Sequence, residues 1–211
     1  MKLHIFAASP NCRKVMALIN YLGMDVKINS LQLEAGTHKG SEIMGLNPNG
    51  SVPVLEDGNY SIWESNAIMQ YIADVDAEQN GENPIYPRDV KKRAEVNKWL
   101  FWQTFHYGRA VGDLAWENFA KALFGLGEAV PELVKDAEDR FYRYAAVLDD
   151  QLNTRDFITG EHVTIADFAM ANTAAYNSMG KVPLENYPAI VAWYARLDKL
   201  DAWSDSTPPA A

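Results

Sequence analysis

The chain has 211 residues, of which 48% are hydrophobic and 22% are charged, a composition typical of a folded globular protein of one or two domains. Its 19 basic and 28 acidic residues leave a net charge of −9, which disfavours broad binding to nucleic acid or to an anionic membrane. The single cysteine, Cys12, excludes an intramolecular disulfide and favours a reducing compartment. Because we find no apolar run of membrane-spanning length and no signal-peptide pattern in the first residues, we expect a soluble cytoplasmic protein.

The first 76 residues alternate between strand and helix patterns, which predicts an α/β domain. In chain order we expect a strand at 3–6, a helix at 15–22 ended by Gly23, a strand near 26–28, a hairpin of strands 52–55 and 60–63 around Asp57-Gly58, and a helix opening at 64–65.

A linker is predicted at residues 77–88, where Gly81, Pro84 and Pro87 stand among polar neighbours. Strand signals nearly disappear after it. Helical patterns follow at 89–120, at 131–152, from Thr164 and after Pro188. We therefore expect a first domain of residues 1–76, the linker, and an all-helical domain of residues 89–211.

The first candidate site is the junction between the first strand and the first helix, where Ser9 and Cys12 lie. Backbone N–H groups and the helix dipole stabilise a thiolate or a phosphate at such a position. The spacing is that of a Cys-x-x-Cys motif with serine in place of the first cysteine, so a disulfide between the two positions is impossible. The Ser9 hydroxyl can donate a hydrogen bond to the thiolate of a ligand. On these residues alone, the alternative that Ser9 only caps the helix is favoured.

Two further junctions can carry chemistry. Pro53 stands just inside a strand, where it belongs to an edge or a bulge. A cis Val52–Pro53 peptide would leave the Val52 N–H and C=O free for an extended ligand, whereas a trans edge proline is the commoner case. At the next strand end, Ser65 is a good helix N-cap that can also hold a ligand carboxylate, and Glu64 can pair with an ammonium; capping alone is the alternative.

Together these motifs resemble, in order and spacing, those of the cytosolic glutathione transferases. The segments that carry the resemblance are Ser-Pro-Asn-Cys-Arg-Lys-Val at 9–15, Asn-Pro-Asn-Gly-Ser-Val-Pro-Val-Leu-Glu-Asp-Gly at 47–58, Trp-Glu-Ser-Asn-Ala-Ile at 63–68, Ile-Tyr-Pro at 85–87 and Val-Thr-Ile-Ala-Asp-Phe at 163–168. The resemblance covers nearly the whole chain. It is closest to the bacterial, phi-, theta- and nu-like branches, which use serine or threonine near the N-terminus.

The resemblance implies an α/β thioredoxin-like N-terminal domain followed by an all-α C-terminal helical bundle domain, and a homodimer. It implies that Ser9 hydrogen-bonds the glutathione sulfur and that Asn11 shares this task, as in the nu-like branch. Cys12 is then expected to be structural. The implied glutathione-binding residues are His38, Lys39, Ser51, Val52, a cis Pro53, Glu64 and Ser65. Ser51 departs from the phi-like pattern, in which glutamine is usual.

The helical half offers three further observations. Thr164 and Asp167 form an acidic relative of the capping box, and we expect a structural role for them. Among the aromatic residues between 99 and 119, Tyr107 and Trp116 are our choices for an apolar acceptor pocket. The four histidines lack metal-ligand spacing, so we expect no metal.

The function that the resemblance implies is a glutathione transferase, which keeps the thiol of bound glutathione as thiolate and transfers it to a small apolar electrophile. The alternative is a glutathione-dependent disulfide oxidoreductase or peroxidase of the nu-like type. A non-catalytic binding module is a third possibility, to which the loss of Ser9, Pro53 or Ser65 would have pointed. The only partners expected are glutathione, a small electrophile and a second copy of the chain.

Overall fold

The computed structural model describes residues 1–32 and 41–208. The chain divides into two compact units, Met1–Tyr86 with Leu200–Ala211 and Pro87–Lys199, and each is described by itself. Within the described residues, every helix is too short or too polar to cross a membrane.

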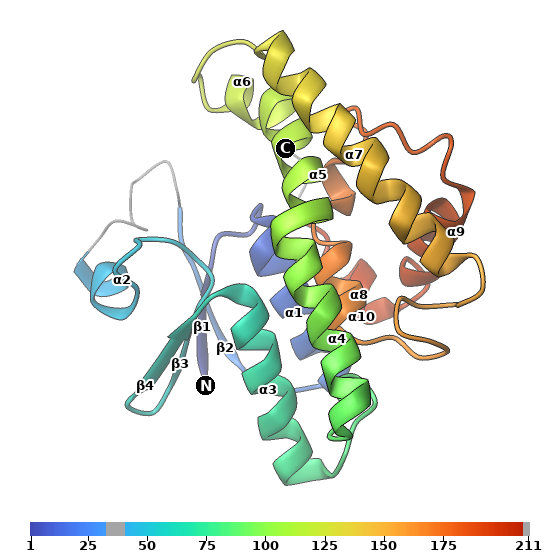
Figure 1. Cartoon of the computed structure of the whole chain (residues 1–211). Helices are drawn as coiled ribbons and strands as arrows, with labels where there is room; N and C mark the ends of the chain where they lie inside the picture. Colours follow the sequence, from blue (N-terminus) through green and yellow to red (C-terminus); the bar gives the residue numbers. More distant parts are fainter. Residues whose placement is uncertain (33–40, 209–211) are drawn as a thin grey trace. The chain divides into compact units, whose positions relative to one another are not determined.

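The first unit is built on a four-stranded mixed sheet with the strand order β2-β1-β3-β4 (Figure 1). β1 (Lys2–Ile5) pairs in parallel with β2 (Lys27–Ser30) and antiparallel with β3 (Val54–Asp57), and β3 pairs antiparallel with β4 (Tyr60–Trp63). The hairpin predicted around Asp57-Gly58 is therefore present. Along β1, buried Leu3 and Ile5 point to the opposite face from Lys2 and His4, because side chains alternate across a strand.

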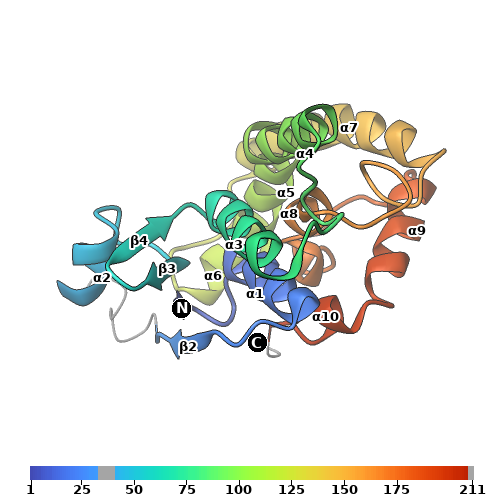
Figure 2. The same ribbon diagram turned by 90° about the horizontal axis from the view of Figure 1, so that it is seen from below.

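Two longer helices, α1 (Pro10–Leu22) and α3 (Ser65–Asn80), pack against each other on one side of the strands (Figure 2). α1 begins at the N-cap Ser9 and ends at Gly23, whose φ of 63° is the left-handed conformation that glycine adopts without a side-chain clash. Both ends of this helix agree with the prediction from sequence. The short helix α2 (Ser41–Leu46) contacts β4.

The end of the chain belongs to this first unit. The helix α10 (Asp201–Ser204) packs against α1, and the Trp203 side chain is fully buried there. The sequence pattern places these residues in the helical domain instead. The structure groups them with residues 1–86, since α10 contacts α1 and the Trp203 ring lies against the Arg13 guanidinium of that helix.

The second unit is entirely helical. The first stretch runs without a break through α4 (Val90–Trp102), the π-helical η3 (Gln103–Tyr107), α5 (Gly108–Ala115), the π-helical η4 (Trp116–Ala120) and α6 (Lys121–Leu123). The stretch is followed by α7 (Pro131–Leu152), α8 (Ile165–Met170), the 3-10 turn η5 (Ala174–Tyr176) and α9 (Pro188–Leu197). A thioredoxin-like sheet unit and an all-α unit are the fold class that the sequence predicted.

Three local details differ from the sequence patterns. α3 continues to Asn80, so the helix covers the first residues of the predicted linker. Ser65 is the first residue inside α3, and its N-cap is Glu64. In the long helical stretch, Phe101 and Phe105 are 66% and 71% exposed, whereas the sequence pattern counts them among the apolar positions of the helix.

Asp167 lies at the centre of the helical unit with no solvent exposure. Its carboxylate accepts hydrogen bonds from Thr164 N (2.8 Å) and Thr164 Oγ1 (3.1 Å), which completes the predicted capping box of α8. It also accepts from Ile158 N at 2.9 Å and from Trp193 Nε1 at 3.0 Å. One buried carboxylate thus joins α8, the loop before it and α9.

Candidate functional site

The three junctions singled out in the sequence meet at one edge of the sheet. Because β3 is antiparallel to both β1 and β4, the ends of β1 and β4 and the start of β3 lie at the same edge. The register confirms this, since Val54 is the partner of His4 on one side and of Trp63 on the other. Residue 64 directly follows β4, residue 52 lies two positions before β3 and residue 9 four positions after β1, so all three lie at or near this edge. The N-termini of α1 and α3 lie there too, and both add positive dipole ends.

At the start of α1, Ser9 is half-buried with extended backbone (φ −77°, ψ 122°). Its carbonyl oxygen accepts from the Arg13 N–H at 3.0 Å, and its Oγ accepts weakly from the Cys12 N–H at 3.4 Å. Since the hydroxyl accepts in this contact, its own hydrogen can still be donated to an anion. Asn11, in the first turn, is exposed at the same helix end. Ser9 can therefore cap α1 and also donate a hydrogen bond from its hydroxyl to a ligand.

Cys12 is only 1% exposed, and burial raises the pKa of its thiol to about 11 despite the hydrogen bond with Ser9. A thiol with this pKa stays protonated at neutral pH and is a poor nucleophile. A thiolate acting at this edge must therefore belong to a ligand, which agrees with the structural role expected for Cys12.

The second junction precedes β3, where the Val52–Pro53 peptide is cis. Pro53 is buried, Val52 is half-buried and Ser51 is exposed. The Asn47 side chain, itself buried, donates to Ser51 O at 2.8 Å and to Ser51 Oγ at 3.2 Å. The side chain of Asn47 fixes the peptide that leads into Val52. His38 and Lys39, the two further residues expected to contact glutathione, lie outside the described residues.

The third junction joins β4 to α3. Glu64 has φ 70° and ψ 108°, a positive-φ backbone conformation that residues other than glycine rarely adopt. Its carbonyl accepts from the Ile68 N–H at 2.9 Å and closes the first turn of α3. The Glu64 side chain is exposed, and Ser65 beside it is 8% exposed. Ser65 therefore does not cap the helix as predicted, but it lies at the helix N-terminus where N–H groups can hold a carboxylate.

A residue that the sequence did not single out connects two of these junctions. Lys14 of α1 is only 2% exposed, and its Nζ donates to Asn66 Oδ1 in the first turn of α3 at 2.7 Å. Burial lowers the pKa of Lys14 to about 7, and the charge of Glu64 offsets part of this shift. In the sequence, the burial of Lys14 is indicated only by its position on a helix face of otherwise apolar and small residues.

The sequence comparisons are consistent with this site. The family model described as Glutathione S-transferase, N-terminal domain, matches residues 1–74, and the one described as Glutathione S-transferase, C-terminal domain, matches residues 116–201. A glutathione S-transferase of Hyoscyamus muticus is 30% identical over 206 residues, covering 97% of this chain and 96% of the relative. The chain belongs to the glutathione S-transferase family.

Two more distant relatives agree with that assignment. Glutathione S-transferase theta-1 of Rattus norvegicus is 27% identical over 201 residues, covering 94% of this chain and 82% of the relative. A solved delta-class glutathione transferase of Nilaparvata lugens is 27% identical and superposes with a TM-score of 0.83 over 98% of this chain and 92% of the other. The chain is thus an enzyme of the glutathione transferase type.

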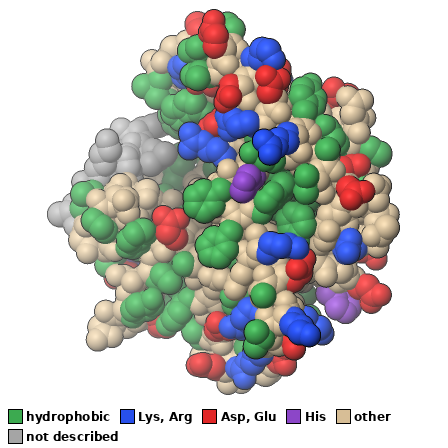
Figure 3. Space-filling model, in the orientation of Figure 1, with side chains coloured by type: hydrophobic (Ala, Val, Ile, Leu, Met, Phe, Trp, Pro, Cys, Tyr) green, Lys and Arg blue, Asp and Glu red, His purple; other side chains and the backbone are tan. Residues whose placement is uncertain are grey.

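In the helical unit of the transferase, the two aromatic residues predicted to line an acceptor pocket lie in different environments. Tyr107 has no solvent exposure, and its hydroxyl lies 3.4 Å from that of Tyr194 in the core, so the prediction that it lines a pocket is wrong. Trp116 is 42% exposed. Phe101 and Phe105, four residues apart and more exposed still, lie on the same helical stretch, where Figure 3 shows hydrophobic side chains gathered at the surface.

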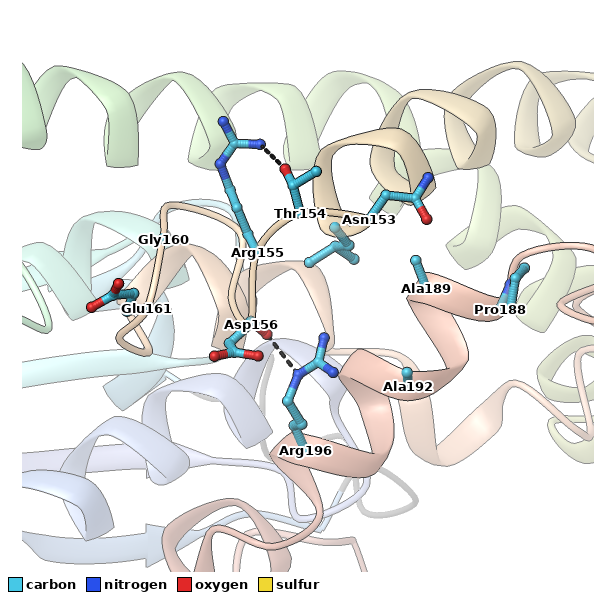
Figure 4. A pocket seen from close by; sticks show the side chains of 11 residues that line it. Asn153, Thr154, Arg155, Asp156, Gly160, Glu161, Pro188, Ala189, Ala192 and Arg196 are labelled. Atoms are coloured by element: carbon cyan, nitrogen blue, oxygen red, sulfur yellow. Dashed lines mark hydrogen bonds between the residues drawn. The ribbon is translucent and has the colours of Figure 1, made fainter.

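The helical unit also contains a surface cavity of about 680 Å³ between the end of α7, the loop after it and α9 (Figure 4). Two arginines line it, but each is already engaged. Arg155 Nη1 donates to Gln151 O at 3.1 Å, and Arg196 Nε donates to Asp156 O at 2.8 Å. Acidic side chains line the same cavity. The hydrogen bonds of the two arginines hold the loop in place. Because the lining carries both positive and negative side chains, it does not indicate whether a ligand would be an anion or a cation.

Proposed function

We propose that this transferase binds glutathione at the sheet edge formed by residues 9, 52 and 64, stabilises its thiolate, and transfers it to a small apolar electrophile. The observation that carries the proposal is the convergence of the three junctions on one edge, together with two helix N-termini. Glutathione is a peptide with two carboxylates, one ammonium and one thiol, so helix N-termini, a free peptide edge and a carboxylate are chemically suited to bind it.

Ser9 is the proposed donor to the glutathione sulfur, with Asn11 sharing the task. The hydrogen bond and the positive end of α1 favour the thiolate over the thiol, so the thiol proton leaves to solvent near neutral pH. The thiolate then uses its electron pair to form a bond to an electrophilic carbon, and the leaving group departs with the electron pair of the bond that breaks. The protein holds both reactants in place, which lowers the entropic part of the barrier.

The remaining contacts follow from the chemistry of the peptide. We propose that the Val52 peptide, held ahead of cis Pro53 and beside Ser51, pairs with the cysteinyl residue of glutathione. Ser65 and the first N–H groups of α3 hold the carboxylate of the γ-glutamyl group, and the exposed Glu64 pairs with its ammonium. His38 and Lys39 stay proposed contacts of the glycine end.

For the acceptor, we propose the exposed aromatic residues of the helical unit, Phe101, Phe105 and Trp116, as the apolar contacts. Phe101 and Phe105 lie about one helical turn apart, and a contiguous exposed apolar patch of this kind, unlike a single exposed side chain, is typical of a binding surface. Tyr107, which the sequence suggested, is excluded by its burial.

A glutathione-dependent disulfide oxidoreductase of the nu-like type is the second candidate, because Asn11 lies beside Ser9. In this reaction the bound thiolate attacks one sulfur of a disulfide and releases the other as a thiolate. A second glutathione thiolate then attacks the glutathione sulfur of the mixed disulfide, which forms glutathione disulfide and releases the remaining half of the substrate as a thiolate. The buried, protonated Cys12 takes no part in either step.

We also propose a homodimeric, cytoplasmic enzyme of the serine-using branches, acting in detoxification. These proposals are supported by the family resemblance and by the single, buried cysteine. Light scattering coupled to size exclusion chromatography measures the dimer directly, and a mass of one chain would contradict it.

The experiment that tests the function is a substrate panel with glutathione present, comprising an activated aryl halide, an isothiocyanate, a small organic disulfide and an organic peroxide. Turnover of the first two supports conjugation. Turnover of the disulfide alone supports the second candidate. Failure to bind glutathione at all would contradict both.

A further inference from the structure

Arg13, in the first turn of α1, is held by two residues near the C-terminal end of the chain, Trp203 and Thr207. These two contacts are called the clamp here. Its guanidinium carbon lies 3.7 Å from the centroid of the Trp203 ring, a close cation–π arrangement. Its Nη2 also donates to Thr207 Oγ1 at 3.2 Å. Arg13 is 4% exposed and Trp203 is fully buried, so their cation–π contact is shielded from water. The residues that hold Arg13 are 190 or more positions away in the chain.

A second tether lies at the other end of the same helix. Asn20, in the last turn of α1, donates from Nδ2 to Ala202 O at 3.3 Å. Residues 200–208, called here the C-terminal segment, therefore contact α1 in both its first and its last turn. Because an α-helix is a regular hydrogen-bonded element, contacts in its first and last turns together limit how far it can shift or rotate.

The clamp is adjacent to the proposed donor residue. The Arg13 N–H hydrogen-bonds the Ser9 carbonyl at 3.0 Å, and the Cys12 N–H hydrogen-bonds both the carbonyl and the Oγ of Ser9. A shift of Arg13 moves this first turn, and with it the Ser9 hydroxyl and the Asn11 side chain. Catalytic groups must hold their geometry closely, since a misplacement of about 1 Å can lower a rate by about 10²-fold.

We infer that Trp203 and Thr207 are positioning residues of the active site, through which the C-terminal segment holds Arg13 and so fixes Ser9 and Asn11 toward the glutathione sulfur. The inference rests on the proposed function, in which Ser9 acts on that sulfur. It assigns a role in catalysis to a segment that carries no residue of the proposed site.

The test compares Trp203→Leu, Trp203→Phe and Thr207→Val with the wild-type enzyme and with Ser9→Ala. Ultraviolet absorbance of the thiolate against pH measures the pKa of bound glutathione, and amide hydrogen exchange measures local opening at Cys12 and Arg13. Trp203→Leu is expected to raise the pKa of the bound thiol by about one unit and to speed exchange at these amides by about tenfold. Trp203→Phe keeps an aromatic face for Arg13 and is expected to restore most of both properties.

Two controls separate positioning from general loss of stability. Trp193→Phe alters a buried tryptophan of the helical unit and is expected to lower the thermal midpoint without moving the thiol pKa. Thr207→Val removes one hydrogen bond at an exposed residue with little change of shape. If Trp203→Leu does not fold, Thr207→Val therefore tests whether the C-terminal segment positions Ser9.

The outcomes separate the inference from the function on which it rests. If Ser9→Ala shifts the thiol pKa and neither Trp203→Leu nor Thr207→Val does, the inference is overturned and the proposed function stands. If Ser9→Ala has no effect, the proposed role of Ser9 fails, and with it the inferred role of Trp203 in catalysis. Unchanged exchange at the Cys12 and Arg13 amides in both Trp203→Leu and Thr207→Val overturns the inferred effect of the C-terminal segment on α1.

Discussion

Lys14, just after the first turn of α1, donates a part-buried hydrogen bond of 2.7 Å to Asn66 in the first turn of α3. The two helix ends that they connect carry Ser9 and Ser65, the residues proposed for the sulfur and the γ-glutamyl group of glutathione. A charged side chain in the interior is unfavourable unless it is paired, and Lys14 has one neutral partner and one nearby carboxylate, Glu64. This arrangement makes the protonation of Lys14 sensitive to pH in the neutral range.

The first prediction follows from the titration of Lys14. Its pKa is about 7 in the folded protein against 10.5 for an exposed lysine. Between these two values the unfolded chain binds more protons than the folded one, so stability rises with pH across this window. Lys14→Met is expected to remove that rise. Urea unfolding at several pH values above neutrality measures it, with Lys27→Met, an exposed lysine of β2, as the control. Equal slopes in wild type and Lys14→Met would contradict the prediction.

A second prediction concerns Asp167 and the stability of the helical unit. Asp167→Ala leaves the Ile158 N–H and the Trp193 indole N–H buried without their acceptor, and each such group costs about 1–3 kcal/mol. We expect the free energy of unfolding to fall by about 3 kcal/mol, with glutathione affinity unchanged. Denaturant unfolding and glutathione titration measure the two. The control is Asp136→Ala, which removes an exposed carboxylate from α7. A stable Asp167→Ala protein that binds glutathione but has lost turnover would show a catalytic role instead.

A third prediction concerns acid stability. On the polar face of the sheet, Glu56 Oε1 lies 2.6 Å from His4 Nε2 and 3.2 Å from Lys2 Nζ, and these contacts lower the pKa of Glu56 below its ordinary value of 4.5. A carboxyl with a lowered pKa stabilises the fold above its unfolded pKa and loses this contribution as the pH falls through the folded one. Glu56→Gln is therefore expected to flatten the loss of stability below about pH 4.5. Denaturant unfolding at several acid pH values measures this, with Glu128→Gln, which removes a carboxyl from an exposed loop, as the control. If Glu56→Gln loses as much stability as wild type when the pH falls, the prediction is wrong.

A fourth prediction separates exposed from buried aromatic residues. Phe105→Ala is expected to raise KM for an apolar aryl halide about fivefold, since an apolar contact of this kind contributes about 1 kcal/mol, and to leave KM for glutathione unchanged. Tyr107→Phe removes the hydroxyl that faces Tyr194 in the core and is expected to change neither KM. Steady-state kinetics with each substrate varied in turn measure both. If Tyr107→Phe changes the KM for the aryl halide and Phe105→Ala does not, the prediction is wrong and Tyr107 contacts the acceptor.

The parts of the fold that sequence predicted carry local signals. Ser9 and Gly23 mark the ends of α1, Asp57-Gly58 marks the hairpin, and Thr164 with Asp167 marks the start of α8. Each signal acts within a few residues, where the chemistry of one side chain decides the backbone conformation. The three junctions could be found for the same reason.

The features that escaped prediction depend on distant contacts or on unusual backbone. Lys14 finds Asn66 at a separation of 52 residues, and Trp203 finds Arg13 from the other end of the chain. Glu64 takes a positive φ that its residue type does not indicate, and this places it at the N-cap where Ser65 was expected. The burial of Tyr107 follows from packing within the helical unit, against Phe141 and Tyr194, which periodicity alone does not reveal.

The central claim is that Ser9 stabilises the thiolate of bound glutathione, and its most direct test is a pH titration of that thiolate by ultraviolet absorbance. In the wild-type enzyme the pKa of the bound thiol is expected to lie below the value of about 8.5 for a free thiol. In Ser9→Ala it is expected to rise toward that value, and in Asn11→Ala to rise by less. A bound thiol with the same pKa in Ser9→Ala as in wild type would contradict the claim.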